Sequence, residues 1–325
     1  MTCLYCGGTE LKPLHRDVKD RLGHVSGTWS FLECVLCRSA VLSPFPNTRD
    51  IEGFYPPVYD FSFQSHSNIG RVLRKLEYLL FFKPQYQVQC RALLRFIGAS
   101  VTKSLSLLDA GCGKGIRLSI FREAGFHVFG SDISVVSTDY AKQLQDVSVS
   151  KCSIDTLEEN FGPNRFDVLT SFYTIEHVPS VETSLKSMWA VLKPGGVLLL
   201  ATLLNESFQS KFWGAKWEGV TEAPRHLTIP STRGLRIALQ KNNFSDICFT
   251  PDSVLNCAGV WLLSLFPSLG VRHSGKGRRR LGRTAPASIV AVLILTPLIL
   301  WCFVENYILR RPALVLVFAK KSGNP

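Results

Sequence analysis

Acidic residues are scarce in this chain. Only 25 of its 325 residues are Asp or Glu, against 37 Lys or Arg, which gives a formal net charge of +12. This balance favours an acidic substrate, a nucleic acid or an anionic membrane surface as a partner, and leaves open a basic protein without a polyanionic partner. Charged residues make up 19% and hydrophobic residues 46%, enough for one α/β domain of about 200 residues with smaller attachments.

Three sequence patterns are absent. The N-terminus, from Met1 on, shows no basic segment followed by an apolar one, so we expect no secretory signal. No internal repeat is present. Four of the ten cysteines form two close pairs and the other six are scattered, which is not a disulfide framework. We therefore expect a reducing environment, in the cytosol or on the cytoplasmic side of a membrane.

Composition divides the chain into five segments. Paired cysteines lie in residues 1–45, and a Pro/aromatic connector with a helical pattern occupies residues 46–100. Residues 101–251 alternate between apolar runs and amphipathic segments. Residues 252–312 are hydrophobic apart from a basic cluster, and residues 313–325 contain a last strand-like run. We expect one central α/β domain with a small N-terminal unit and a hydrophobic helical insertion before the last strand.

The central segment has the pattern of repeated strand–helix–strand units. Strands are expected over residues 106–110, 127–131, 147–152, 166–171, 197–203, 244–250 and 313–319, and helices over 116–124, 134–144 and 231–241. This alternation predicts a doubly wound, mostly parallel sheet of seven strands with helices on both faces. Ligands of such sheets bind at the carboxyl ends of the strands.

A glycine-rich loop follows the first expected strand, and residues 109–115 read D-A-G-C-G-K-G. Glycines let the backbone turn tightly and approach a ligand, and the helix that follows offers free N–H groups. Asp132 ends the second strand, 21 residues after Gly111, where a carboxylate can accept hydrogen bonds from ribose hydroxyls. The loop matches neither the G-x-G-x-x-G dinucleotide pattern nor the P-loop.

The D-x-G-x-G-x-G loop resembles motif I of class I S-adenosylmethionine (SAM)-dependent methyltransferases. Residues 166–171, 175–178 and 192–196 resemble this family's fourth strand, the segment after it and the turn before the fifth strand. The resemblance covers roughly residues 70–250 and the last strand, and it implies SAM as the cofactor. It assigns cofactor contacts to Asp109, Gly111, Gly113, Gly115, Asp132 and Asp155. Asp155 would meet the adenine amino group; an ordinary helix cap is the alternative for it.

Candidate acceptor-side residues follow the fourth strand. Methyl transfer is an in-line displacement that needs a positioned nucleophile and often a base for its proton. Glu176 and His177 lie where the family places acceptor-facing residues, and histidine is the natural base near neutral pH. His226, in a Pro-x-His-Leu element that resembles the family's acceptor lid, is the third catalytic candidate. The alternatives are that Glu176 and His177 only order their loop and that His226 caps a helix.

The two cysteine pairs are Cys3-x-x-Cys6 and Cys34-x-x-Cys37. Two such knuckles can place four thiolates tetrahedrally around zinc, and four cysteines leave no open position for catalysis. We expect a structural zinc ribbon. Residues 42–59 resemble the connector of methyltransferases that have such a ribbon.

Two uncharged runs, 19 and 21 residues long, cover residues 253–271 and 284–304. Each approaches the length that crosses a bilayer. A single crossing would separate residues 244–250 from 313–319, which must join one sheet, and two crossings would send six basic residues across. These are Arg272, Lys276, Arg278, Arg279, Arg280 and Arg283. We expect a membrane-surface hairpin with its basic loop on anionic headgroups; a helical lid without membrane contact is the alternative.

Together these features predict a cytoplasmic SAM-dependent methyltransferase, peripheral on a membrane. It would O-methylate a small-molecule, glycan or lipid-linked acceptor. No Asn/Asp-Pro-Pro-Tyr/Phe motif follows the fourth strand, where residues 171–174 read S-F-Y-T, so N-methylation of a base is disfavoured. Nucleic acid is disfavoured because the basic residues cluster in the insertion. The alternatives are an RNA or protein methyltransferase that uses the ribbon for recognition, and a non-catalytic membrane-tethered SAM-binding scaffold.

Overall fold

The computed structural model describes most of the chain. The described residues are 1–55, 72, 75, 76, 78–98, 105–134, 138, 139, 141, 147–267 and 296–323. Most of the helix expected at residues 134–144, much of the connector and the whole basic cluster at 272–283 lie outside them.

A seven-stranded sheet forms the centre of the molecule, as predicted, in the order β10-β11-β8-β7-β4-β5-β6. Its strands are β4 (Ser106–Ala110), β5 (His127–Asp132), β6 (Ser148–Lys151), β7 (Phe166–Phe172), β8 (Leu192–Leu203), β10 (Phe244–Pro251) and β11 (Leu314–Lys321). The first five are parallel, and β11 pairs antiparallel with both β8 and β10. The strand order reverses between β4 and β7, which is where sheets of this kind bind ligands.

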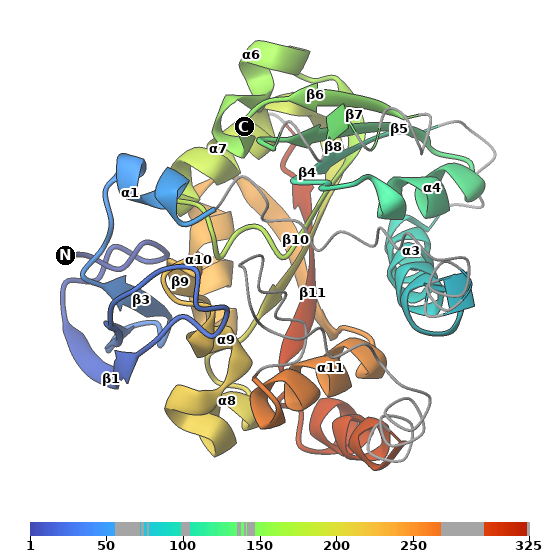
Figure 1. Cartoon of the computed structure of the whole chain (residues 1–325). Coiled ribbons are helices and arrows are strands. Elements are labelled where there is room, and N and C mark those ends of the chain that lie inside the picture. Colours follow the sequence, from blue (N-terminus) through green and yellow to red (C-terminus); the bar gives the residue numbers. More distant parts are fainter. Residues whose placement is uncertain are drawn as a thin grey trace.

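Helices cover both faces of this sheet (Figure 1). On one face lie α7 (Val181–Val191) and α10 (Thr232–Lys241), and on the other α3 (Lys83–Ile97) and α4 (Ile116–Glu123). The inner strands are nearly continuous apolar runs, as expected for strands that are buried on both faces. Each face therefore has its own core, one around Leu185 and Met188 and the other around Leu93 and Phe121.

The N-terminal segment forms a second sheet of four strands, in the order β1-β2-β3-β9. Its first three strands are β1 (Leu11–Val18), β2 (Trp29–Cys34) and β3 (Ala40–Ser43). The fourth, β9 (Thr228–Ile229), comes from the loop between β8 and α10. The segment predicted at residues 1–45 thus shares its sheet with the catalytic part of the chain.

Short helices complete the described structure. They are α1 (Thr48–Gly53), η1 (Tyr78–Phe82), η2 (Ile154–Thr156), α6 (Leu157–Phe161), α8 (Phe208–Trp213), η3 (Gly214–Lys216) and α9 (Glu218–Thr221). The expected strand boundaries agree with the structure to within two residues except at β8, which begins at Leu192 rather than at residue 197, because Leu192 already pairs with Phe166 of β7.

The hydrophobic insertion is described at its two ends. Helix α11 (Val254–Leu265) follows β10, and a helix over residues 296–303 continues into η4 (Val304–Ile308) before β11. The two ends are joined by a hydrogen bond of 2.8 Å from Trp261 Nε1 to Glu305 Oε1. Among the residues that the structure describes, no helix has both the length and the apolar character needed to cross a membrane.

Candidate active site

The glycine loop lies between β4 and α4, at the switch in strand order. Gly111, Gly113 and Gly115 have φ angles of 77°, 52° and 67°, a left-handed conformation that favours glycine. A Cβ on Gly111 would lie only 2.6 Å from Thr174 Oγ1, just after β7. The glycine loop therefore lies directly against the end of β7. Residues that follow β4 and residues that follow β7 can both contribute to the site.

Asp132, at the end of β5, anchors this loop. Its Oδ2 accepts a hydrogen bond of 2.8 Å from the Gly113 N–H, and its Oδ1 accepts one of the same length from the Ser134 N–H. Burial raises the pKa of Asp132, and these two backbone donors oppose the rise. Because each carboxylate oxygen can accept more than one hydrogen bond, Asp132 retains acceptor capacity at the position predicted for the ribose hydroxyls.

Asp109 is a buried carboxylate with one oxygen unused. Its Oδ1 accepts a 2.7 Å hydrogen bond from Thr170 Oγ1, whereas its Oδ2 has no hydrogen-bond partner within the described part of the chain. Burial raises the pKa of Asp109 to about 6. An unpaired buried carboxylate oxygen is costly, so this position fits a cationic donor such as the ammonium group of SAM.

Asp155 lies in η2, after β6. Its Oδ1 accepts a hydrogen bond from the hydroxyl of Ser184 in α7, and its backbone N–H donates to Ser153 Oγ. The side chain is thus tied to α7, and contact with an adenine amino group stays a prediction.

On the acceptor side, the structure brings together three residues that are far apart in sequence. Oxygen or nitrogen atoms of Glu176, His177 and His226 all lie within 4.8 Å of one another. The two imidazole ring centroids are 4.7 Å apart. Besides the four cysteines, this is the only group of three or more His, Cys, Asp or Glu side chains among the described residues whose ligand atoms lie this close together.

Each histidine in this group keeps one ring nitrogen for a ligand. His177 Nδ1 lies 3.0 Å from the Arg225 carbonyl oxygen, and His226 Nδ1 lies 2.6 Å from that of Gly219. A carbonyl only accepts, so each Nδ1 has the proton and each Nε2 is an acceptor. Burial lowers the pKa of His177 to about 3 and also lowers that of His226, which keeps both rings neutral at pH 7.

Glu176 is fully buried beside these rings. Its Oε2 accepts a 3.1 Å hydrogen bond from Thr202 Oγ1, and no described residue bonds to its Oε1. Burial raises the pKa of Glu176 to about 8. The group therefore combines a carboxyl that retains its proton with two neutral bases.

A second polar network borders the site on the side of the insertion, and no sequence pattern predicted it. Tyr173, directly after β7, has a φ of 55°, and its hydroxyl donates to Asp252 at the end of β10. Asp252 also accepts from Asn256 Nδ2 at 3.0 Å and from Gln89 Nε2 at 3.0 and 3.2 Å. Arg117 Nε donates to Gln89 Oε1, which connects α4 to the same network. Its members are separated by up to 167 positions, so only the fold brings them together.

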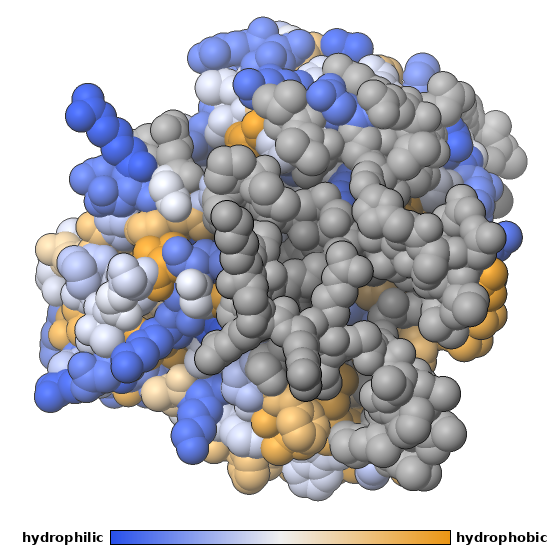
Figure 2. Space-filling model, in the orientation of Figure 1, coloured by the Kyte–Doolittle hydropathy of each residue, from blue (hydrophilic) through white to orange (hydrophobic). Residues whose placement is uncertain are grey.

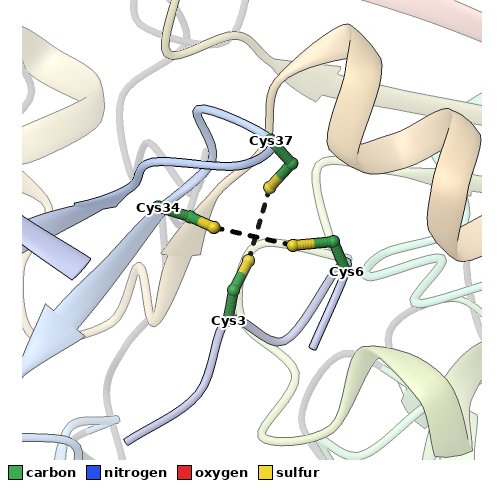
Figure 3. A group of neighbouring side chains, drawn as sticks. All are labelled: Cys3, Cys6, Cys34 and Cys37. Carbon is green, nitrogen blue, oxygen red and sulfur yellow. Dashed lines mark hydrogen bonds between the residues drawn. The ribbon is translucent and has the colours of Figure 1, made fainter. Parts of the chain in front are cut away.

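The four paired cysteines converge as predicted. All are buried, and their sulfurs point toward a common centre (Figure 3). The Sγ atoms of Cys3 and Cys37 are 3.4 Å apart and those of Cys6 and Cys34 are 3.5 Å apart. Four thiols on two knuckles are the donor set of a structural zinc site. All ten cysteines of the chain are free.

Comparison with known proteins agrees with this geometry. Residues 82–248, just over half of the chain, match a family model described as a methyltransferase domain. The chain belongs to the class I SAM-dependent methyltransferases.

The methyltransferase has several curated relatives. It is 32% identical over 121 residues to the ubiquinone biosynthesis O-methyltransferase of Coxiella burnetii, an alignment covering 36% of this chain and 51% of that protein. Its counterpart in Rhodopseudomonas palustris is 36% identical over 115 residues, covering 34% and 44%. The chain thus spans about half the length of the curated relatives it matches. A solved SAM-dependent methyltransferase of Thermotoga maritima, described as a possible histamine N-methyltransferase, matches 77% of this chain and 96% of its own at 16% identity and a TM-score of 0.48.

Replacing Asp132 by alanine tests the cofactor half of the site. We expect Asp132→Ala to weaken SAM binding by about 10- to 100-fold, because it removes charge-assisted hydrogen bonds to the ribose and the anchor of the glycine loop. Isothermal titration calorimetry measures the change. Asp139→Ala, which removes an exposed carboxylate further along the chain, is the control and should leave the affinity unchanged. Equal affinities in both variants would contradict the assignment.

Replacing Glu176 by glutamine tests its raised pKa. Between pH 4.5 and about 8 the folded protein binds more protons at this group than the unfolded chain, so wild-type stability falls as the pH rises. The Glu176→Gln variant lacks this loss. Its free energy of unfolding relative to wild type should therefore increase from pH 5 to pH 8, by up to about 1.4 kcal/mol per pH unit. Urea unfolding at several pH values measures it.

The exposed Glu159→Gln variant is the control for this experiment, and its stability difference should not depend on pH over the same range. A Glu176→Gln difference that is equally flat would show that Glu176 is ionised in the folded protein.

Proposed function

We propose that this methyltransferase transfers the methyl group of SAM to a hydroxyl oxygen of a small-molecule, glycan or lipid-linked acceptor. The observation that carries this proposal is the group of Glu176, His177 and His226. It provides two neutral imidazoles, each with Nε2 available, and it begins two residues after the Thr174 side chain that touches the glycine loop. A base at this place suits an acceptor whose oxygen loses a proton as the new bond forms.

Each part of the site has a role in this reaction. SAM, when bound, supplies a methyl group on a positively charged sulfur, and Asp109, Asp132 and the three loop glycines would bind it. His177 Nε2 accepts the proton of the acceptor hydroxyl as the oxygen–methyl bond forms and the methyl–sulfur bond breaks, leaving S-adenosylhomocysteine and a methyl ether. His226 and Glu176 position this ring.

Oxygen is favoured over nitrogen as the methylated atom for two reasons. Residues 171–174 lack the Asn/Asp-Pro-Pro-Tyr/Phe motif of enzymes that methylate base amino groups. The curated relatives are named as O-methyltransferases of ubiquinone biosynthesis, and we extend the reaction type, though not the acceptor, to this chain.

The proposed acceptor is amphiphilic, because the surface beside the insertion suits an anionic membrane. Apolar side chains are exposed along residues 300–309, and they are Leu300, Trp301, Phe303, Tyr307, Ile308 and Leu309. Two exposed arginines, Arg310 and Arg311, follow directly, and the only acidic residue over 296–311, Glu305, is buried. Figure 2 shows further hydrophobic surface at the lower edge of the molecule, over the region of α11. Exposed aromatics next to arginines favour the interface of an anionic bilayer.

We further propose that the cysteine group binds a structural zinc ion and that the enzyme acts on the cytoplasmic face of the membrane. Ten free cysteines support a reducing environment. The thiolates of Cys3, Cys6, Cys34 and Cys37 would be the ligands.

Transfer of labelled methyl groups tests the reaction. The purified enzyme with labelled SAM should label an organic-solvent extract of membrane lipids and small molecules, but neither RNA nor protein. We expect His177→Gln to lower kcat by about 10²- to 10⁴-fold, the contribution of a general base, while calorimetric SAM affinity stays unchanged. His127→Gln, on an exposed histidine of β5, is the matched control.

Two outcomes would overturn this proposal. Labelling of RNA or protein would make the ribbon a recognition module for a macromolecule. SAM binding without transfer to any fraction would make the protein a binding scaffold.

Sedimentation with lipid vesicles tests the membrane surface. We expect binding to vesicles that contain an anionic lipid, weaker binding to neutral vesicles, and loss of the difference at high salt. The double variant Trp301→Ser/Phe303→Ser should bind at least about 10-fold more weakly, because two apolar side chains no longer leave water. Leu36→Ser, on an exposed leucine of the turn between β2 and β3, is the control. Equal binding of both variants would place the membrane contact elsewhere or exclude it.

A further inference from the structure

The N-terminal sheet and the acceptor side of the site share a strand. Residues of β9 pair antiparallel with β3, so that Ala40 is opposite Ile229 and Val41 is opposite Thr228. The Leu42 N–H donates to the Leu227 carbonyl at 2.9 Å. This pairing joins the cysteine segment to the residues immediately after His226.

The second cysteine knuckle also contacts the start of α10. The hydroxyl of Ser231 donates to the Cys37 carbonyl, and the Ser231 N–H donates to Ser39 Oγ at 3.0 Å. A Cβ on Gly234 would lie 2.1 Å from Ser39 Oγ, so the Ser39 side chain packs directly against the Gly234 backbone. On the first knuckle, Lys241 Nζ donates to the Cys6 carbonyl at 2.8 Å.

Buried ion pairs make a third connection. The side chains of Arg225 and Asp20 are 0% and 1% exposed, and the guanidinium donates to both carboxylate oxygens of Asp20. Asp20 also accepts from the backbone N–H groups of the loop after β1, at Leu22, His24 and Val25. Because breaking a buried pair leaves an uncompensated charge, this contact strongly favours one position of Arg225.

The segment fixed in this way is bonded directly to the proposed base. The N–H groups of Leu227 and Thr228 donate to the Glu176 carbonyl at 2.8 and 3.2 Å. The Arg225 carbonyl lies 3.0 Å from His177 Nδ1 and thereby sets which nitrogen of that ring accepts a proton. Contacts therefore run without interruption from the Cys37 knuckle to His177.

Among the residues that the structure describes, the hydrogen bonds of Asp109 and Asp132 do not extend to the N-terminal sheet. Asp109 accepts a hydrogen bond from Thr170, and Asp132 accepts hydrogen bonds from Gly113 and Ser134, all within residues 101–251. Loss of order in the N-terminal sheet would reach the acceptor side through residues 221–231 and leave these contacts in place.

We propose that the four-cysteine unit is a positioning element of the acceptor site. With a metal ion bound to Cys3, Cys6, Cys34 and Cys37, it fixes residues 221–231, and with them the ring nitrogens of His177 and His226, but it does not contribute to SAM binding. This inference rests on the proposed function only for the role of the histidines. The order it describes can be measured without any acceptor.

Hydrogen–deuterium exchange of the full chain, with one equivalent of Zn²⁺ and after removal of metal by a chelator, tests the proposal. We expect peptides over residues 221–231 to exchange at least about 10-fold faster without metal, with peptides of β4, β5 and β7 unchanged. Calorimetric SAM affinity should stay within about threefold in both states.

Two results would overturn the proposal. Protection of residues 221–231 that persists while residues 3–42 exchange freely would make the cysteine unit an independent module. If removal of the metal abolishes SAM binding and also the protection of β4 and β5 from exchange, the metal supports the whole fold.

A matched pair of variants separates the connection from the metal. Ser231→Ala removes the hydrogen bond from the hydroxyl to the Cys37 carbonyl and the N-cap of α10, whereas Ser180→Ala removes the N-cap of α7, which does not contact the cysteines. We expect both to bind Co²⁺ with the absorption of a four-thiolate site, and only Ser231→Ala to speed exchange over residues 225–231. Equal exchange in the two variants would contradict the connection. Failure of the methyl-transfer assay would leave these measurements valid, so the two proposals can fail separately.

Discussion

Close approach of the glycine loop to the end of β7 is the constraint on which both halves of the site depend. Gly111 lies where any side chain would meet Thr174, and the His177 N–H bonds to the Thr174 carbonyl at 2.9 Å. The short segment after β7 therefore contacts the glycine loop through Thr174, and it also contains Glu176 and His177 of the proposed acceptor side. The reversal of strand order between β4 and β7 creates this place, since the loops after the two strands leave in different directions.

Both halves contain a buried carboxyl group that is only partly satisfied. Asp109 and Glu176 each have one oxygen bonded to a threonine hydroxyl and one oxygen without a described partner. Burial raises the pKa of both, to about 6 and about 8. Such groups reduce the stability of the folded chain, and a bound cation or a shared proton offsets the cost. The unpaired oxygens of these two carboxyls therefore indicate where a ligand or a proton would bind, which the fully hydrogen-bonded groups around them do not.

The sequence predicted the features that local pattern determines. Apolar runs predicted the seven strands of the sheet, and the spacing of the glycines predicted the loop that lies between Asp109 and Asp132. Contacts between distant residues were not predictable in this way. The bond from Tyr173 to Asp252 joins an aromatic residue and an acid 79 positions apart, and β9 is a strand of two residues with no periodicity to detect. Lys321 illustrates the same limit: it is the second of two lysines at the end of β11, yet it is buried and its ammonium donates to the Leu192 carbonyl.

Features set by local sequence pattern and contacts between distant residues contribute to different halves of the proposed site. The proposed cofactor residues come mainly from β4, β5 and their loops, whereas the proposed acceptor side is completed by segments far along the chain. The N-terminal sheet positions Arg225 and His226, and the start of the insertion positions Tyr173 through Asp252. We expect substitutions in these attachments to alter the proposed acceptor site without touching Asp109 or Asp132. The same separation explains why the sequence motifs identify SAM clearly and say little about the acceptor.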